Sequence, residues 1–292
     1  MSSLAYEIVD VFTDRPFAGN PLAVVYGAEA LAGDQMQMLA REFHLSETVF
    51  VLPPSDIEAT YRARIFTPEE ELPFAGHPSI GAAVTSVRRG LAASGRVVQE
   101  CGAGLLPIVV SGAGSATLTG GTPTRGGEFA PEVLLELTGL AADDYAGGSA
   151  TPSAAGCGLE FVYLPVERRA LARAGVDAAR AARAGVSQIS VFAWDDMTRT
   201  AYARVFCPGV AVPEDPATGS AALGLGVWLV ANGRLPGDGT TAYTVHQGLE
   251  MHRPSLLECT VTASSGAATS ATVAGHVVPI AKGEIAVPPF VG

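Results

Sequence analysis

Two short turns carry residue types suited to binding and transforming a small anion. They are Phe74-Ala-Gly-His-Pro78 and Glu214-Asp-Pro-Ala-Thr-Gly-Ser220, and an apolar stretch follows each of them. The stretch after Ser220 is apolar on every side, which is typical of a buried helix. The first amides of a buried helix need partners and favour negative charge. We therefore expect each turn to open a helix whose start binds a small anion.

Two ionisable side chains stand out at or near the first turn. His77 occupies the expected positive end of a helix, which favours the neutral ring, with one nitrogen donating and the other accepting. Glu47 lies between the apolar end of an expected helix and a strand rich in Val and Phe. A hydrogen-bonded structural His77 and an exposed Glu47 are the alternatives, because Glu is usually exposed.

The second turn has its own alternative interpretation. Asp215 precedes a proline, where aspartate often caps a helix or forms a turn, and Thr218 and Ser220 can also be caps only. Serine hydrolase chemistry is disfavoured because no GxSxG motif occurs. Chemistry with a pair of thiols is also disfavoured, because Cys207 has Thr67 at the equivalent place in the other half of the chain.

The two turns belong to an internal repeat. Arg-Ile-Phe-Thr-Pro, which begins at residue 64, matches Arg-Val-Phe-Cys-Pro about 140 residues later, a distance too long for a solenoid. The matching positions are Arg64 and Arg204, Gly76 and Gly219, Gly81 and Gly224, and His77 and Ser220. The repeat predicts two similar lobes, each offering one helix start. We expect these starts to face each other across a cleft and to form one site for a small acid.

Composition and charge exclude several classes of partner. The 292 residues are 48% hydrophobic and 16% charged, with a net charge of −11, so neither nucleic acid nor an anionic membrane surface is an expected partner. No apolar run is long enough to span a bilayer. The four cysteines are far apart, which disfavours a zinc site. The first ten residues lack the pattern of a signal peptide, so we expect a cytoplasmic protein with reduced thiols.

Hydrophobic periodicity predicts more strands than helices, and many strands are joined by short loops. This favours a mixed α+β fold, and no nucleotide-binding motif is present. We expect an N-terminal lobe over 1–120, a linker over 120–127 and a C-terminal lobe over 128–278, with a strand at about 279–292 returning to the first lobe. Helices are expected from Asp34, from Pro78, over 131–140, over 167–184 and from Ser220. Strands are expected over 6–12, 22–25, 45–51, 61–66, 97–110 (a hairpin), 116–118, 161–166, 189–194, 200–206, 243–247, 256–263, 271–278 and 283–287.

These segments together resemble the PhzF-like phenazine-biosynthesis family, which has the diaminopimelate-epimerase fold. The matching pieces cover nearly the whole chain in the family's order: Asp10-Val-Phe-Thr13, Phe17-Ala-Gly-Asn-Pro-Leu-Ala-Val24, Leu45-Ser-Glu-Thr-Val-Phe50, Arg64-Ile-Phe-Thr-Pro68, Phe74-Ala-Gly-His-Pro78, Glu214-Asp-Pro-Ala-Thr-Gly-Ser220, Gln247-Gly248 and Arg253-Pro-Ser255. One departure is His252, where the family pattern has glycine.

The resemblance implies two lobes, each a curved, mostly antiparallel sheet or barrel around a central helix, with the site between them. It implies a homodimer, no metal and no organic cofactor. The family's best-known reaction isomerises trans-2,3-dihydro-3-hydroxyanthranilate, and by the family pattern Glu47 is the acid/base. A buried site would raise the pKa of Glu47 from about 4.3 toward the working pH. The residues implied to bind the substrate are Asn20, Gly76, His77, Asp215, Thr218, Gly219 and Ser220.

Two other functions stay open at this point. In the first alternative, the chain is an isomerase or epimerase of another small amino or hydroxy acid, because the same carboxyl chemistry serves any acidic C–H beside an unsaturated system. Alternatively, it is a catalytically silent protein that binds a small acid between its lobes.

Overall fold

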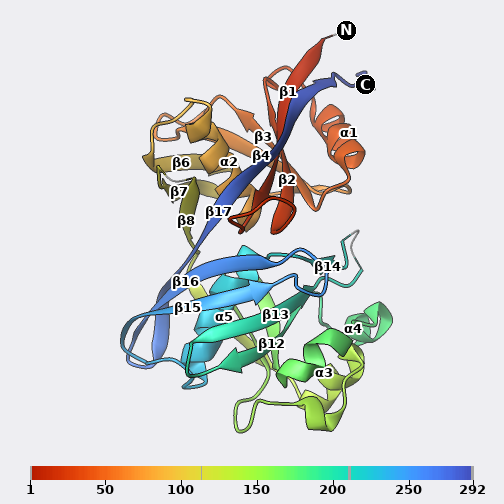
Figure 1. Ribbon diagram of the computed structural model, residues 1–292, viewed down its shortest axis with the longest axis vertical. Coiled ribbons are helices and arrows are strands. Elements are labelled where there is room, and N and C mark those ends of the chain that lie inside the picture. Colours follow the sequence, from red (N-terminus) through yellow and green to blue (C-terminus); the bar gives the residue numbers. More distant parts are fainter. Residues whose placement is uncertain (1, 113, 210–211, 291–292) are drawn as a thin grey trace. The chain divides into compact units, whose positions relative to one another are not determined.

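The computed structural model describes residues 2–112, 114–209 and 212–290, and it has a mixed α+β fold (Figure 1). Two compact units are present: Met1–Leu118 with Ala274–Gly292, and Thr119–Val273. Each unit has a mostly antiparallel curved sheet around one central helix, so the predicted fold class is confirmed. Residues 1, 113, 210–211 and 291–292 lie outside the described residues. The outermost parts of the expected first lobe and of the final strand fall among them.

In the first unit the strands form a closed barrel. The order around the ring is β1–β2–β3–β4–β6–β7–β8–β17 and back to β1. The β2–β3 and β4–β6 pairings are parallel, as a crossover helix requires. The strands are β1 Ser3–Val11, β2 Asn20–Tyr26, β3 Glu47–Leu52, β4 Tyr61–Phe66, β6 Gly95–Cys101, β7 Gly104–Val110, β8 Ser115–Thr119 and β17 Ala267–Ala286, of which the part from Ala274 belongs to this unit.

Helix α2 (Gly76–Arg88) is the central helix of this barrel, and it contacts β1, β2, β3, β4, β6 and β7. Gly81 allows the close packing, because a Cβ atom there would lie 2.3 Å from Leu22 Cδ2. The other helix of the unit, α1 (Gly33–Phe43), buries one face against β3 and β4. Between α1 and the sheet, the rings of Phe50 and Phe66 pack edge to face.

In the second unit the strand order is β9–β10–β11–β12–β13–β15–β16, in which the β11–β12 and β13–β15 pairings are parallel and the other four are antiparallel. Strand β16 enters β17 through a turn in which Ser265 and Gly266 both have positive φ, as a tight hairpin turn requires. The strands are β9 Pro123–Glu128, β10 Ser153–Cys157, β11 Glu160–Pro165, β12 Ile189–Asp195, β13 Thr200–Phe206, β15 Gly239–Gln247 and β16 Ser255–Ser264.

Helix α5 (Gly219–Ala231) is the central helix of the second unit, and it contacts β9, β10, β11 and β16. Glycines let two tyrosine hydroxyls reach its backbone. The Tyr163 hydroxyl donates to Ala221 O at 2.7 Å, and the Tyr243 hydroxyl donates to Ala222 O at 2.7 Å. These hydroxyls lie where Cβ atoms at positions 224 and 226 would be. An apolar helix with no exposed face is thereby fixed against its curved sheet.

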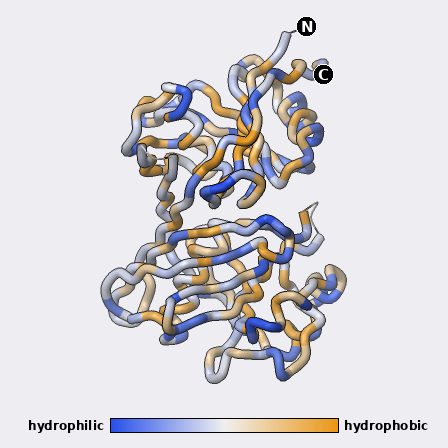
Figure 2. Tube along the Cα trace, in the orientation of Figure 1, coloured by the Kyte–Doolittle hydropathy of each residue, from blue (hydrophilic) through white to orange (hydrophobic). Residues whose placement is uncertain are grey.

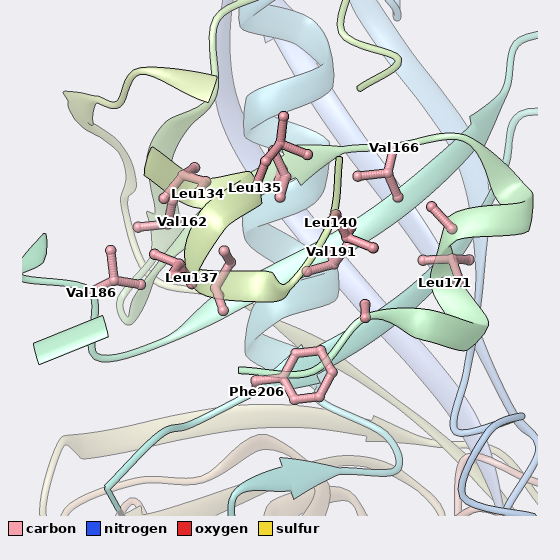
Figure 3. Packing of buried hydrophobic residues seen from close by; sticks show 14 of the residues in the cluster. Leu134, Leu135, Leu137, Leu140, Val162, Val166, Leu171, Val186, Val191 and Phe206 are labelled. Atoms are coloured by element: carbon pink, nitrogen blue, oxygen red, sulfur yellow. The ribbon is translucent and has the colours of Figure 1, made fainter. Parts of the chain in front are cut away.

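A second core of this unit lies on the outer side of the sheet, under α3 (Pro131–Thr138) and α4 (Ala178–Ala184) (Figure 3). Leucines of α3, including Leu134 and Leu137, pack there with Val162 and Val191 of the strands. Apolar and polar residues alternate along strands such as β16, as the colours of Figure 2 show. Among the described residues, no helix combines the length and apolarity that crossing a membrane requires.

Several elements differ from the sequence expectation. The helix expected over 167–184 is two pieces, the 3-10 helix η2 (Arg168–Arg173) and α4, because Asp177 caps a new helix by accepting from Arg180 N. The linker expected over 120–127 enters strand β9, which pairs with β10. The strands expected over 271–278 and 283–287 are one continuous strand, β17. The short elements η1 (Ala142–Asp144), β5 (Glu71–Leu72) and β14 (Glu214–Asp215) were not expected.

Candidate active site

The internal repeat is present as a repeated ion pair before each central helix. In the first unit the Arg64 guanidinium donates to both oxygens of Glu71, each at 2.7 Å. In the second unit the Arg204 guanidinium donates to both oxygens of Glu214, at 2.7 and 2.8 Å. Each acid lies in a short strand, β5 or β14, that pairs with the arginine's own strand. The same bidentate arginine–glutamate pair, which we call the fork, therefore holds the chain just before α2 and α5 begin.

Three predicted site residues of the first unit come together at the start of α2. Asn20 begins β2, Glu47 begins β3, and His77 lies in the first turn of α2. His77 Nδ1 is 3.2 Å from Asn20 Nδ2, and His77 Nε2 is 3.6 Å from Glu47 Oε2. Asn20 is fully buried, His77 is 4% exposed, and the Glu47 side chain is 17% exposed. The alternative of an exposed Glu47 is therefore wrong.

Burial sets the charge of His77. Removal of the ring from water disfavours the imidazolium and lowers the pKa of His77 to about 3. The ring is consequently neutral near pH 7, as its place at a helix start predicts. A neutral imidazole offers one donor and one acceptor to its neighbours.

The low pKa of His77 predicts that the protein loses stability in acid. The unfolded chain binds a proton at this histidine below about pH 6.5, whereas the folded chain does so only near pH 3. As the pH falls between these values, the free energy of unfolding decreases by up to about 1.4 kcal/mol per pH unit. We expect the free energy of unfolding, followed by far-UV circular dichroism, to fall more steeply from pH 6.5 to 4.5 in the wild type than in His77→Asn. Equal slopes would contradict a neutral buried ring.

In neither central helix does the N-cap residue cap the helix with its own side chain. The N-cap of α2 is Ala75, and the N-cap of α5 is Thr218, whose side chain makes no capping hydrogen bond. The Thr218 hydroxyl donates instead to Asp215 Oδ2, at 2.6 Å. Thr218 is therefore the N-cap by position, but its hydroxyl contacts Asp215 and does not cap α5. Ser220 lies within the first turn of α5, so it is not the N-cap. Both helix starts, including the amides of Gly76 and Gly219, have the character of an anion site.

The turn over 214–218 is held by residues of β15 and β16 to which the sequence assigned no role. Gln247, which is 1% exposed, accepts from Thr218 N at 3.1 Å and donates to Asp215 O at 2.7 Å. The Ser255 hydroxyl donates to Pro216 O at 2.9 Å. At Gly248, φ is +73° and a Cβ atom would lie 2.6 Å from Pro216 O. The motif residues around Gln247 are therefore supports for Asp215 and Thr218.

The departure from the family pattern at His252 has a structural consequence. His252 has a φ of +57° in the turn over 248–253, where its amide donates to Leu249 O. Glycine adopts this conformation freely, whereas other L-residues pay about 1–2 kcal/mol. We expect His252→Gly to stabilise the protein by about 1 kcal/mol, measured by urea unfolding. His252→Ala is the control, because it removes the imidazole and keeps the strain; equal stabilisation by both variants would exclude the backbone explanation.

The two units differ in what they place at the equivalent positions. Thr48 pairs with Phe66 in the first unit, and Ile189 pairs with Phe206 in the second. Through this register Gln188 corresponds to Glu47, and Ser220 corresponds to His77 by the sequence repeat. The ionisable pair therefore occurs in the first unit, and its counterpart in the second unit is neutral. In the described part of the chain, no three His, Cys, Asp or Glu side chains form a cluster that could hold a metal.

The predicted site residues thus form two groups. Asn20, Glu47, Gly76 and His77 lie together in the first unit, and the second unit contributes the others. Those are Asp215, Thr218, Gly219 and Ser220, which lie at the start of α5. Thiols are not part of either group. Cys157 is buried in β10, where desolvation raises its pKa to about 12. A thiol with such a pKa is protonated near pH 7, so it offers no thiolate to accept a proton.

Comparisons with known proteins agree over nearly the whole chain. A family model described as phenazine biosynthesis-like protein (PhzC-PhzF) matches residues 9–283. An uncharacterized isomerase of Mesorhizobium japonicum is 35% identical, over 98% of this chain and 99% of its own. Trans-2,3-dihydro-3-hydroxyanthranilate isomerase of Pseudomonas aeruginosa is 31% identical, over 95% of this chain and 98% of its own.

A solved structure has the same fold. The phenazine biosynthesis protein of the PhzF family from Bacillus anthracis superposes with a TM-score of 0.88 at 26% identity, over 98% of this chain and 100% of that one. Sequence motifs, fold and relatives therefore agree. The chain belongs to the phenazine biosynthesis-like PhzF family and is an isomerase of that family.

Proposed function

We propose that this isomerase moves a proton within a small unsaturated carboxylic acid, with Glu47 as the only acid/base, and that trans-2,3-dihydro-3-hydroxyanthranilate is its substrate. The observation that carries the proposal is the place of Glu47, mostly buried and 3.6 Å from a neutral His77, at a helix start whose N-cap residue, Ala75, has no capping side chain. The isomerase from Pseudomonas aeruginosa, which is named for that substrate, supports the choice of acid.

The proposed reaction needs one carboxyl group in two protonation states. The Glu47 carboxylate removes the proton at C3, beside the hydroxyl, and the electrons of that C–H bond shift the double bonds. The same carboxyl group then returns the proton to C1, giving an enol that becomes a ketone. No atom is gained or lost, and no oxidant or reductant is consumed. Gln188, which corresponds to Glu47 in the second unit, cannot exchange a proton as a carboxyl group does. This supports a mechanism with one base rather than a pair of bases.

The remaining residues bind the substrate in this proposal. His77, Asp215 and Ser220 hold its polar groups, with Asn20 and Thr218 beside them. The amides at the two helix starts, at Gly76, Gly219 and Ser220, bind its carboxylate. A homodimer, a reaction without cofactor, and lobes over 1–120 and 128–278 remain part of the proposal.

The test is an assay in D2O with purified protein and trans-2,3-dihydro-3-hydroxyanthranilate, followed by proton NMR. We expect the substrate to be consumed and the product to carry hydrogen or deuterium newly placed at C1. A mixture of transferred protium and solvent deuterium would show how well the partly buried carboxyl group is shielded. Absence of both conversion and exchange at high enzyme concentration would refute this substrate.

A different small acid is the second candidate, and one observation favours it. Proteins named as uncharacterized isomerases, including one at 35% identity, are as similar to this chain as the isomerase of known name. A panel of cyclic amino and hydroxy acids in the same D2O assay separates the candidates, because the true substrate class exchanges a carbon-bound proton. Tight binding of a panel member with no exchange would instead indicate a silent binding protein.

A further inference from the structure

The environment of His77 selects one form of its neutral ring. On one side, Asn20 Nδ2 lies 3.2 Å from Nδ1, and an amide nitrogen only donates, so Nδ1 must accept. On the other side, Nε2 faces the Glu47 carboxylate, which only accepts when ionised. Both neighbours therefore require the proton on Nε2. At 3.6 Å the second contact is longer than a hydrogen bond, and such contacts often shorten when a substrate binds.

Asn20 is held firmly enough to impose this choice. Its side chain is fully buried, and its backbone pairs with Val11 at the end of β1. The preceding residue, Gly19, has a φ of +66°, and a Cβ atom there would lie 2.3 Å from Val11 O. Only glycine fits this turn, so the chain enters β2 in one conformation. The low pKa of His77, caused by its burial, keeps the ring neutral near pH 7, where the site of the single proton matters.

We propose that Asn20 is a positioning residue that fixes His77 in the Nε2–H tautomer and thereby directs an N–H donor at the Glu47 carboxylate. The donor orients this carboxylate for proton transfer. The sequence placed Asn20 among residues that bind the substrate, whereas its contact with Nδ1 gives it a role through His77. The catalytic part of the inference rests on the proposed function of Glu47, and the tautomer does not.

The tautomer is measured directly by nitrogen-15 NMR of protein labelled in histidine, in which the two ring nitrogens of a neutral imidazole have separate shifts. The signal of His77 is identified by its absence in His77→Gln. We expect the Nε2–H pattern in the wild type at pH 7. An Nδ1–H pattern there would overturn the inference, and this measurement needs no Asn20 variant to fold.

Asn20→Asp is the decisive variant, because it replaces a donor by an acceptor in nearly the same volume. We expect the proton to move to Nδ1, or the ring to hold both protons, and kcat to fall about 10- to 100-fold with KM changed less than about 3-fold. Asn232→Asp is the matched control, since Asn232 donates to Trp228 O at the far end of α5. We expect it to keep the wild-type tautomer and activity.

The outcomes separate the two proposals. An Asn20→Asp spectrum with the wild-type Nε2–H pattern would refute the positioning role. A loss of activity that appears entirely in KM would make Asn20 a substrate-binding residue instead. If the tautomer changes as expected while even the wild type has no activity on any tested acid, the inference stands and the proposed function fails.

Discussion

Glu47→Gln is expected to lower kcat on the true substrate by about 10²- to 10⁴-fold, the usual contribution of a general acid/base. The amide keeps the shape of the side chain and loses the ability to exchange a proton. His77 Nε2, now 3.6 Å from the carboxylate oxygen, can donate to the amide oxygen equally well, so binding should change little. Measurement of kcat and KM, together with hydrogen exchange at the substrate carbon in D2O, tests both statements.

Glu70→Gln is the matched control, because Glu70 is an exposed glutamate of the same unit. It should leave kcat unchanged. Near-wild-type turnover by Glu47→Gln would exclude Glu47 as the acid/base and leave the site without an assigned proton carrier. A large increase in KM alone would make Glu47 a binding residue.

Arg204→Ala is expected to destabilise the protein by about 3 kcal/mol, because it leaves a mostly buried acid without its partner. Arg204 is 11% exposed and Glu214 is 19% exposed, and the two share a bidentate pair. The same guanidinium also donates to the carbonyls of Leu171 and Ala174 at the end of η2. Its loss would therefore loosen η2 and also β14, which contains Asp215 and precedes the start of α5.

The repeat supplies the control for this prediction. Arg64 makes the same fork with Glu71, but the two side chains are 29% and 42% exposed. Solvent screens the pair, so Arg64→Ala should cost about 1 kcal/mol or less. Far-UV circular dichroism during urea unfolding measures both variants. The two tryptophans, Trp194 and Trp228, belong to the second unit, so their fluorescence reports its unfolding in Arg204→Ala. Equal costs for the two variants would show that burial does not control the energy of the fork.

The fold class and the internal repeat could be predicted from the sequence, because they depend on local periodicity and on matching motifs. Short motifs around Arg64 and Arg204 indicated a duplicated architecture before any contact was known. The length of β17 was not predictable. Pro279 and Gly283 suggest an interruption, whereas pairing with β1 carries the strand through them. The break at Asp177 was missed because a run of Ala and Arg favours helix on both sides of it.

In the candidate site, too, the features that depend on local sequence were predictable and those that depend on tertiary contacts were not. His77 and Ser220 stood out from their positions before apolar helices. The closeness of Asn20, Glu47 and His77 depends on strand register between distant segments, which no spacing in the sequence gives. The support that Gln247 gives to Asp215 and Thr218 has the same origin. His252 was recognisable only as a departure from a pattern, and its positive φ explains why glycine is the expected residue.

The final strand constrains how the polypeptide matures on the ribosome. Ala274–Gly292 completes the barrel that begins with β1, whereas Thr119–Val273 forms a continuous unit. During synthesis one edge of β1 therefore stays unpaired until the residues of β17 that pair with it, 277–286, have left the exit tunnel. The C-terminal half can assemble earlier from contiguous chain. A released polypeptide that ends at residue 273 should consequently bind chaperones through its first 118 residues, whereas its segment over 119–273 becomes resistant to protease.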